Sequence, residues 1–219
     1  MFLKTRSVPP EWVQKQHELA GRVKFEPFAS VPRFVAGADI AFGPTGKEAV
    51  AVAIVWDRES RQIVEQQLAR RPLEYPYVPG FLSFREGPAL EDAIGKLKHP
   101  WEVICFDGQG LAHPRRCGLA THMGVTLNRP AIGCAKSRLI GTYNEPSEIQ
   151  GSSSPLMDKQ EQIGVVLRTR AKVNPMFISV GHKMDLESAV RIVMVCVTQY
   201  RLPEPTRQAD ILTKRYRLP

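Results

Sequence analysis

The stretch WEVICFDGQGLAHPRRCG, residues 101–118, decides the fold class and predicts the position of a site. Its apolar run at residues 103–106 is typical of a strand that a sheet buries on both faces, and Asp107 follows at the C-terminal end of that run. Open α/β sheets bind their ligands at this end of their strands. Gly108 then allows the backbone to approach a ligand closely, and His113 follows. The stretch therefore predicts a buried strand that delivers a carboxylate to a site, although a strand followed by an ordinary turn gives the same Asp-Gly pair.

The composition indicates one domain with an anionic partner. With 219 residues, 43% of them hydrophobic, the chain is long enough for one well-buried core, and we expect a single domain over residues 1–219 that acts as a monomer. Thirty Lys plus Arg against 22 Asp plus Glu give a net charge of +8, which favours nucleic acid as the partner. Charge alone does not separate DNA, RNA and a membrane surface.

Two further features bear on the compartment. No apolar run approaches the roughly 20 residues of a membrane span, and residues 1–10 contain no long apolar segment followed by a cleavage site. The four cysteines have no CxxC spacing and lie mostly in apolar runs: Cys105, Cys117, Cys134 and Cys196. We therefore expect a cytoplasmic protein with reduced thiols, without a disulfide, a zinc site or a membrane contact.

Hydrophobic patterns outside the central stretch predict an alternation of strands and helices. Strands are expected at residues 33–42, 48–57, 61–69 and 130–135, and two more at 162–170 and 175–181 are expected to pair as a hairpin. Helices are expected at 9–23, 83–98, 118–128 and 185–200, with a last one after Pro203 and Pro205. The segment 142–160 is expected to be a surface loop. These patterns alone support the α/β class.

Two charged side chains stand within or directly after predicted strands. Asp39 lies inside the apolar run 33–42, where a charge is costly to bury unless it is paired or binds a cation; an edge position facing water is the alternative. Lys136 follows another predicted strand. If that strand is parallel to the one before Asp107, the lysine and the aspartate emerge at the same edge of the sheet.

A proline-rich segment predicts a stiff, projecting loop. Pro76, Pro79 and Gly80 frame Tyr77 and Val78. An aromatic side chain held in this way loses little conformational entropy when it inserts between stacked bases, so Tyr77 is a candidate wedge. The alternative is a tyrosine that packs back onto the core.

Acidic residues on a basic chain predict metal chemistry. Glu86 has the capping-box spacing with Ser83, and Asp210 has basic neighbours about one helical turn away, so each has an ordinary structural explanation. Together with Asp39 and Asp107, however, they form a set of hard oxygen ligands that suits Mg²⁺ or Mn²⁺. Such cations support phosphodiester hydrolysis, which predicts a metal-dependent nuclease. The order of elements resembles that of the ribonuclease H-like fold, a mixed sheet flanked by helices.

Five motifs follow one another along the chain: VAGADIAF (35–42), YPYVPGFLSFRE (75–86), CFDGQGLAHPRRCGLATHMG (105–124), GCAKS (133–137) and LPEPTRQAD (202–210). Together they resemble the endonuclease V family, which is directed at deoxyinosine. The resemblance extends from about residue 9 to residue 215. It implies the ribonuclease H-like fold for nearly the whole chain.

The resemblance also implies roles for individual residues. Three carboxylates match the metal ligands of the family, and they would hold Mg²⁺, with Mn²⁺ able to substitute: Asp39, Glu86 and Asp107. Three further residues match catalytic positions near the metal or the scissile phosphate: His113, Lys136 and Asp210. Seven match the parts that bind substrate, namely the wedge of Pro76, Tyr77, Val78 and Pro79 and the base pocket of Leu82, Gly108 and Gly118.

The implied reaction is hydrolysis of the second phosphodiester bond on the 3′ side of deoxyinosine, in double- or single-stranded DNA, leaving 3′-hydroxyl and 5′-phosphate ends. Three alternatives stay open. The incision half of a nucleotide-excision nuclease has a similar fold, although the loop at 76–79 and the run from Cys105 to Arg116 argue against it. A catalytically silent binder of inosine-containing nucleic acid would have little use for clustered carboxylates. An inosine-specific ribonuclease is the third, because no motif reports 2′-hydroxyl recognition.

Overall fold

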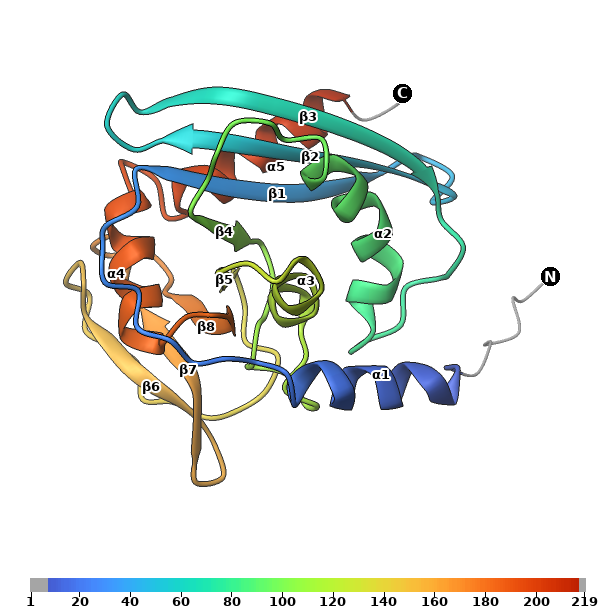
Figure 1. Ribbon diagram of the computed structural model, residues 1–219. Helices are drawn as coiled ribbons and strands as arrows, with labels where there is room; N and C mark the ends of the chain where they lie inside the picture. The colour runs from blue at the N-terminus through green and yellow to red at the C-terminus, as the bar shows by residue number, and fades with distance from the viewer. Residues whose placement is uncertain (1–7, 217–219) are drawn as a thin grey trace.

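A computed structural model describes residues 8–216, and they form one eight-stranded mixed sheet covered by five helices (Figure 1). The strands are β1 (Phe34–Phe42), β2 (Glu48–Asp57), β3 (Gln62–Pro72), β4 (Val103–Phe106), β5 (Ala131–Ala135), β6 (Ser153–Asp158), β7 (Glu161–Leu167) and β8 (Met176–His182). The helices are α1 (Pro10–Ala20), α2 (Leu82–Ile94), α3 (Leu119–Leu127), α4 (Leu186–Cys196) and α5 (Glu204–Tyr216). The predicted class, a mixed sheet with flanking helices, is confirmed.

The sheet order is β3-β2-β1-β4-β5-β8-β7-β6. β1, β2 and β3 form an antiparallel meander, whereas β4 and β5 run parallel to β1. This order and direction of the first five strands is the ribonuclease H-like arrangement that the resemblance implied. Since β1, β4 and β5 are parallel neighbours, their C-terminal ends meet at one edge of the sheet, where ligands of such sheets bind.

Alternation along the central strands divides the core into two layers. On one face, residues such as Val35 and Val103 pack with Ile192 of α4 and Leu212 of α5. On the other face, Ala36 and its neighbours pack with residues of α2 and α3. The first layer has larger side chains, and the second is rich in alanine, so α2 and α3 can lie close to the sheet. Helix α1 packs on α3, outside this second layer (Figure 1).

The segment 142–160 is not a loop throughout, so that prediction is wrong. Its second half is β6, which pairs antiparallel with β7 as a hairpin at the edge of the sheet. Pro155 and the serines before it conceal the strand in the sequence. An edge strand tolerates a proline because one row of its backbone groups needs no partner strand.

The predicted capping box of α2 is also wrong. The helix begins at Leu82, so Ser83 lies inside the first turn and caps nothing. Its Oγ instead contacts Nδ1 of His122 on α3 at 2.9 Å. Glu86 is therefore free of a capping role and is available to the site.

Three other predictions concern the sheet interior and the compartment. Strands β7 and β8 pair as the expected hairpin, and all four cysteines are free and buried. Over residues 8–216, we find no helix of the length and apolar character needed to cross a membrane. The prediction for the N-terminal segment lies mostly outside the described residues, which begin at residue 8.

Candidate active site

Asp39 lies in the middle of β1 and faces α5. Gly37, two residues earlier on the same face, allows α5 to approach, because a Cβ at this glycine would lie 2.1 Å from the Pro205 carbonyl oxygen. The close approach brings Thr213 of α5 to the strand, where its hydroxyl donates to Asp39 Oδ2 at 2.8 Å. Asp39 is only partly exposed and belongs to a central strand, so the predicted alternative of an edge position is wrong.

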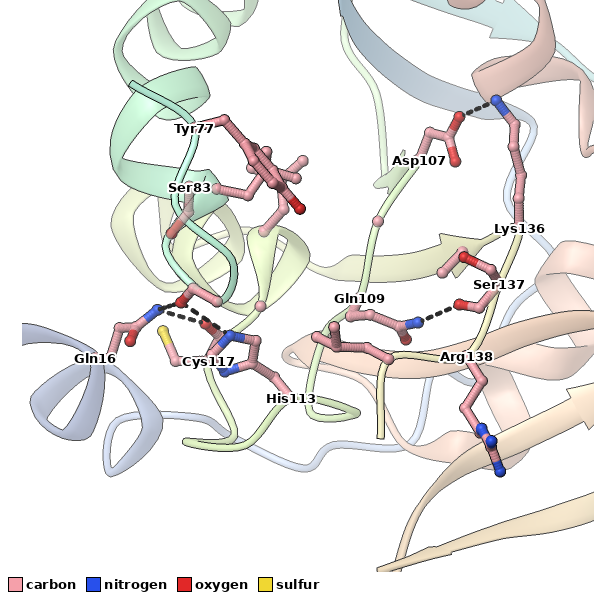
Figure 2. Close-up of a pocket in the computed structure, with 17 residues that line it drawn as sticks. Gln16, Tyr77, Ser83, Asp107, Gln109, His113, Cys117, Lys136, Ser137 and Arg138 are labelled. Atoms are coloured by element: carbon pink, nitrogen blue, oxygen red, sulfur yellow. Dashed lines mark hydrogen bonds and ion pairs between the residues drawn. The ribbon is translucent and has the colours of Figure 1, made fainter. Parts of the chain in front are cut away.

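Asp107 and Lys136 directly follow the parallel strands β4 and β5. Their side chains form an ion pair between Asp107 Oδ2 and Lys136 Nζ (Figure 2). The same ammonium lies 3.9 Å from Asp210 Oδ1, and Lys214 Nζ contacts Asp210 Oδ2 at 2.6 Å. The condition that the sequence left open, parallel strands, is therefore met, and the fold brings Asp107, Lys136 and Asp210 together.

Burial and neighbouring negative charges raise the pKa values of two carboxylates, Glu86 and Asp39. Burial raises the pKa of Glu86, which is 6% exposed, to about 8, and the negative charges of Asp39 and Asp107 add to this. Burial also raises the pKa of Asp39 to about 6; the Thr213 hydrogen bond opposes this, while Asp107 and Asp210 reinforce it. The carboxylates thus repel one another within one partly buried site, and a bound cation would relieve that repulsion.

The chemistry of this cluster fits a hard divalent cation. Its potential donors, Asp39, Glu86 and Asp107, offer carboxylate oxygens without sulfur or nitrogen, as Mg²⁺ and Mn²⁺ prefer. Within residues 8–216, no three such side chains already meet in a ready ligand geometry. The Lys136 ammonium, paired with Asp107, supplies positive charge beside the carboxylates.

A cavity of about 320 Å³ adjoins Asp107, which is the carboxylate of the set that lines it. Tyr77 lies on one side of it and the Asp107–Lys136 pair on the other (Figure 2). Tyr77 is 60% exposed, so the alternative in which it packs back onto the core is wrong. All three predicted pocket residues line the cavity: Leu82, Gly108 and Gly118. The other three wedge residues, Pro76, Val78 and Pro79, do not line the cavity.

Gly118 shows why a glycine is needed in this wall. A Cβ at this position would lie 2.3 Å from the carbonyl oxygen of Gln109, well inside contact distance. Gln109 itself is held by a hydrogen bond from its Nε2 to the Ser137 carbonyl at 2.8 Å (Figure 2). At Gly118 the cavity wall therefore consists of closely packed backbone.

His113 lies on the Tyr77 side of the cavity, with both ring nitrogens engaged. Nε2 contacts the Gly80 carbonyl at 3.1 Å, and Nδ1 accepts from the Arg115 backbone N–H at 3.2 Å. Because a carbonyl only accepts and a backbone N–H only donates, the ring is neutral, with its proton on Nε2. Burial, helped by Arg115, lowers the pKa of His113 to about 4. Its predicted role near the phosphate stays a prediction.

Sequence reasoning missed two polar residues that the fold brings to the site. Thr213 binds Asp39, and it could have been found because it lies three positions after Asp210 on the same helix face. Gln16 of α1 is fully buried and lines the cavity, although its helix reads as simple scaffold. Its sequence neighbours give no indication of this contact.

Comparisons with known proteins identify the family of this chain. A sequence model of the endonuclease V family matches residues 17–211. Endonuclease V of Roseiflexus sp. (strain RS-1) is 48% identical over 187 residues, which are 85% of this chain and 83% of that protein. The crystal structure of endonuclease V from Streptomyces avermitilis superposes with a TM-score of 0.90 at 38% identity, covering 97% of this chain and 94% of the other.

A third relative was solved with nucleic acid. Endonuclease V of Ciona intestinalis, in complex with a 24mer DNA containing an inosine followed by a ribo-adenosine, has a TM-score of 0.83 and 29% identity, covering 94% of this chain and 96% of the other. The similarity in sequence and in structure extends over nearly the whole length of each protein compared. This chain belongs to the endonuclease V family and is an endonuclease of that class.

Proposed function

We propose that the protein is a Mg²⁺-dependent endonuclease, active as a single-domain monomer, that recognises deoxyinosine in DNA and hydrolyses the second phosphodiester bond on its 3′ side. The products would carry 3′-hydroxyl and 5′-phosphate ends. One observation carries the proposal: a cavity of about 320 Å³ lies between the exposed Tyr77 and the ion pair of Asp107 with Lys136. A base that leaves its duplex could enter this cavity while its backbone lies against the carboxylates.

In this proposal Asp39, Glu86 and Asp107 hold the cation, with Mn²⁺ able to replace Mg²⁺. When bound, such a cation lowers the pKa of an attacking water and stabilises the leaving oxygen. Thr213 orients Asp39 through their 2.8 Å hydrogen bond, which occupies one oxygen of the carboxylate. Lys136 holds Asp107 and offers its ammonium to a phosphate.

Other residues at the cavity would recognise the lesion base. Tyr77 would fill the gap that the flipped base leaves in the stack, with Pro76, Val78 and Pro79 forming the rest of the wedge. Leu82, Gly108 and Gly118 would contact the base, largely through backbone groups. Asp210 forms ion pairs with two lysine side chains, Lys136 and Lys214, at the edge of the site.

The Ciona relative supports DNA as the partner, since its complex contains inosine in DNA. The residue after that inosine is a ribo-adenosine, which favours testing an inosine-specific ribonuclease as the second candidate. A single experiment separates the two. End-labelled duplexes with and without one deoxyinosine, and an RNA strand containing inosine, are incubated in Mg²⁺ and in EDTA.

We expect a Mg²⁺-dependent nick directly after the 3′ neighbour of deoxyinosine, that is, at the second phosphodiester bond on the 3′ side of the lesion. Cleavage confined to RNA would favour the second candidate. Asp39→Ala should abolish cleavage, with a loss of at least about 10³-fold, while lesion binding in EDTA is retained. The matched control is Asp92→Ala on α2, which removes an exposed carboxylate paired with Arg71 at 3.2 Å. Tight lesion binding by the wild-type protein without cleavage of any strand would instead identify a silent binder.

A further inference from the structure

Helix α1 contacts both ends of the loop that carries Tyr77. The Trp12 ring meets Tyr75 edge-on, with centroids 4.6 Å apart, before the loop, and stacks on Phe84, with centroids 4.5 Å apart, after it. One helical turn later, Gln16 Nε2 donates to the Gly80 carbonyl at 2.9 Å. Residues four apart lie on one helix face, so a single face of α1 holds both stems of the loop.

The Gly80 carbonyl is a fixed point of this loop. The Phe81 N–H donates to the Val78 carbonyl at 3.0 Å and closes a tight turn, in which Gly80 has a φ of 80°. This conformation is easy for glycine and strained for other residues. Besides Gln16, Arg115 Nη2 donates to the same carbonyl at 2.9 Å, and so does the His113 ring at 3.1 Å. Three donors from two segments therefore fix the turn that directly follows Tyr77.

Gln16 connects these segments. Its Oε1 accepts from Arg115 Nε, and its Nε2 also contacts the Cys117 carbonyl at 3.2 Å, directly before Gly118 in the cavity wall. The side chain is fully buried, so each polar atom depends on these partners. In Figure 2, Gln16 points from α1 toward the Tyr77 side of the cavity. One amide thus ties the wedge loop, the cavity wall and α1 together.

We propose that Trp12 and Gln16 are positioning residues that hold Tyr77 ready for insertion and thereby set the preference for inosine-containing DNA. The inference rests on the proposed wedge function of Tyr77. An exposed aromatic on an unsupported loop would lose conformational freedom at the moment of insertion, whereas a preorganised one avoids that cost. This lower cost strengthens binding only when Tyr77 inserts, that is, when a base leaves the stack.

The test compares Gln16→Leu, Tyr77→Ala and the double variant in EDTA, where no cleavage occurs. Affinity is measured for duplexes with and without deoxyinosine, and 2-aminopurine beside the inosine reports unstacking by its fluorescence. We expect each single variant to weaken inosine-duplex binding about 10-fold, on the order expected for loss of one stacking contact, and to reduce the fluorescence change. The double variant should match Tyr77→Ala alone, because both substitutions remove the same contribution.

Three further variants separate positioning from general stability. Gln14→Leu is the matched control on the exposed face of α1, where the side chain donates a hydrogen bond to Glu18, and it should leave both measurements unchanged. Trp12→Phe keeps a ring to stack on Phe84 and should retain inosine-duplex binding, whereas Trp12→Ala should weaken it no more than Tyr77→Ala does. Urea midpoints of all variants identify any loss of folding.

The outcomes distinguish the two proposals. If Tyr77→Ala leaves inosine binding and fluorescence unchanged, the wedge function itself is wrong and this inference falls with it. If Tyr77→Ala weakens both but folded Gln16→Leu does not, only the positioning role is overturned. Additive losses in the double variant would likewise overturn it, because they would show that Gln16 acts independently of Tyr77.

Discussion

The surroundings of Glu86 disfavour the charged form of its carboxyl group. Its pKa of about 8 lies far above the value near 4.5 of a free glutamate, because it is buried and faces Asp39 and Asp107. Between these pH values the folded protein retains a proton that the unfolded chain has lost. The free energy of unfolding of the metal-free protein should therefore fall as pH rises from about 5 to 8.

Urea unfolding in EDTA at several pH values checks this expectation. In Glu86→Gln, the fall in the free energy of unfolding between pH 5 and pH 8 should be smaller than in the wild-type protein, by an amount on the order of 2–4 kcal/mol. Glu187→Gln, at an exposed position on α4, is the control and should leave the profile unchanged. Addition of Mg²⁺ should restore stability at pH 8 in the wild-type protein but not in Glu86→Gln. Identical profiles for the wild-type protein and Glu86→Gln would refute the buried-charge account.

At the scale of elements, the contact between β1 and α5 sets the distance between Asp39 and its partner Thr213. It depends on Gly37, where a Cβ would lie 2.1 Å from the backbone oxygen of Pro205 and 2.8 Å from its Cβ. Gly37→Ala must therefore move α5 away from the strand. We expect a loss of about 1–3 kcal/mol in unfolding free energy, and a loss of cleavage larger than that destabilisation explains.

Cleavage rates at a temperature where the variant is fully folded, together with urea midpoints, test this. The matched control is Gly21→Ala at the end of α1, where φ is −68° and a Cβ would lie 3.5 Å from its nearest neighbour, an ordinary contact. A folded Gly37→Ala protein with normal cleavage would show that the spacing of α5 is unimportant.

At the scale of the whole molecule, we expect the net charge of +8 to favour association with DNA. Phosphate contacts release counterions, so the logarithm of affinity should fall linearly with the logarithm of salt concentration, with a slope of about −0.9 for each phosphate contacted. Anisotropy titrations between 50 and 200 mM salt should give similar slopes for duplexes with and without deoxyinosine. A slope near zero would contradict a charge-driven interface.

Much of the fold could be predicted from the sequence because it depends on local patterns. The run before Asp107 is apolar at every position, and the alternating segments around it have the lengths of strands and helices. Elements that local patterns describe poorly were missed. Strand β6 contains Pro155, and its pairing with β7 comes from the edge of the sheet rather than from its own propensity.

The motif residues and the chemical types of the site were likewise determined by the sequence: carboxylates, a lysine and a rigid tyrosine loop on a basic chain. Their convergence was decided only by the tertiary structure. The pairing of Lys136 with Asp107 required parallel β4 and β5, and the contact of Thr213 with Asp39 required the approach of α5 at Gly37. The burial of Gln16 beneath the Tyr77 loop depends on partners 64 and 101 residues away. Such contacts leave no local pattern, because the free energy that selects them comes from packing between distant segments.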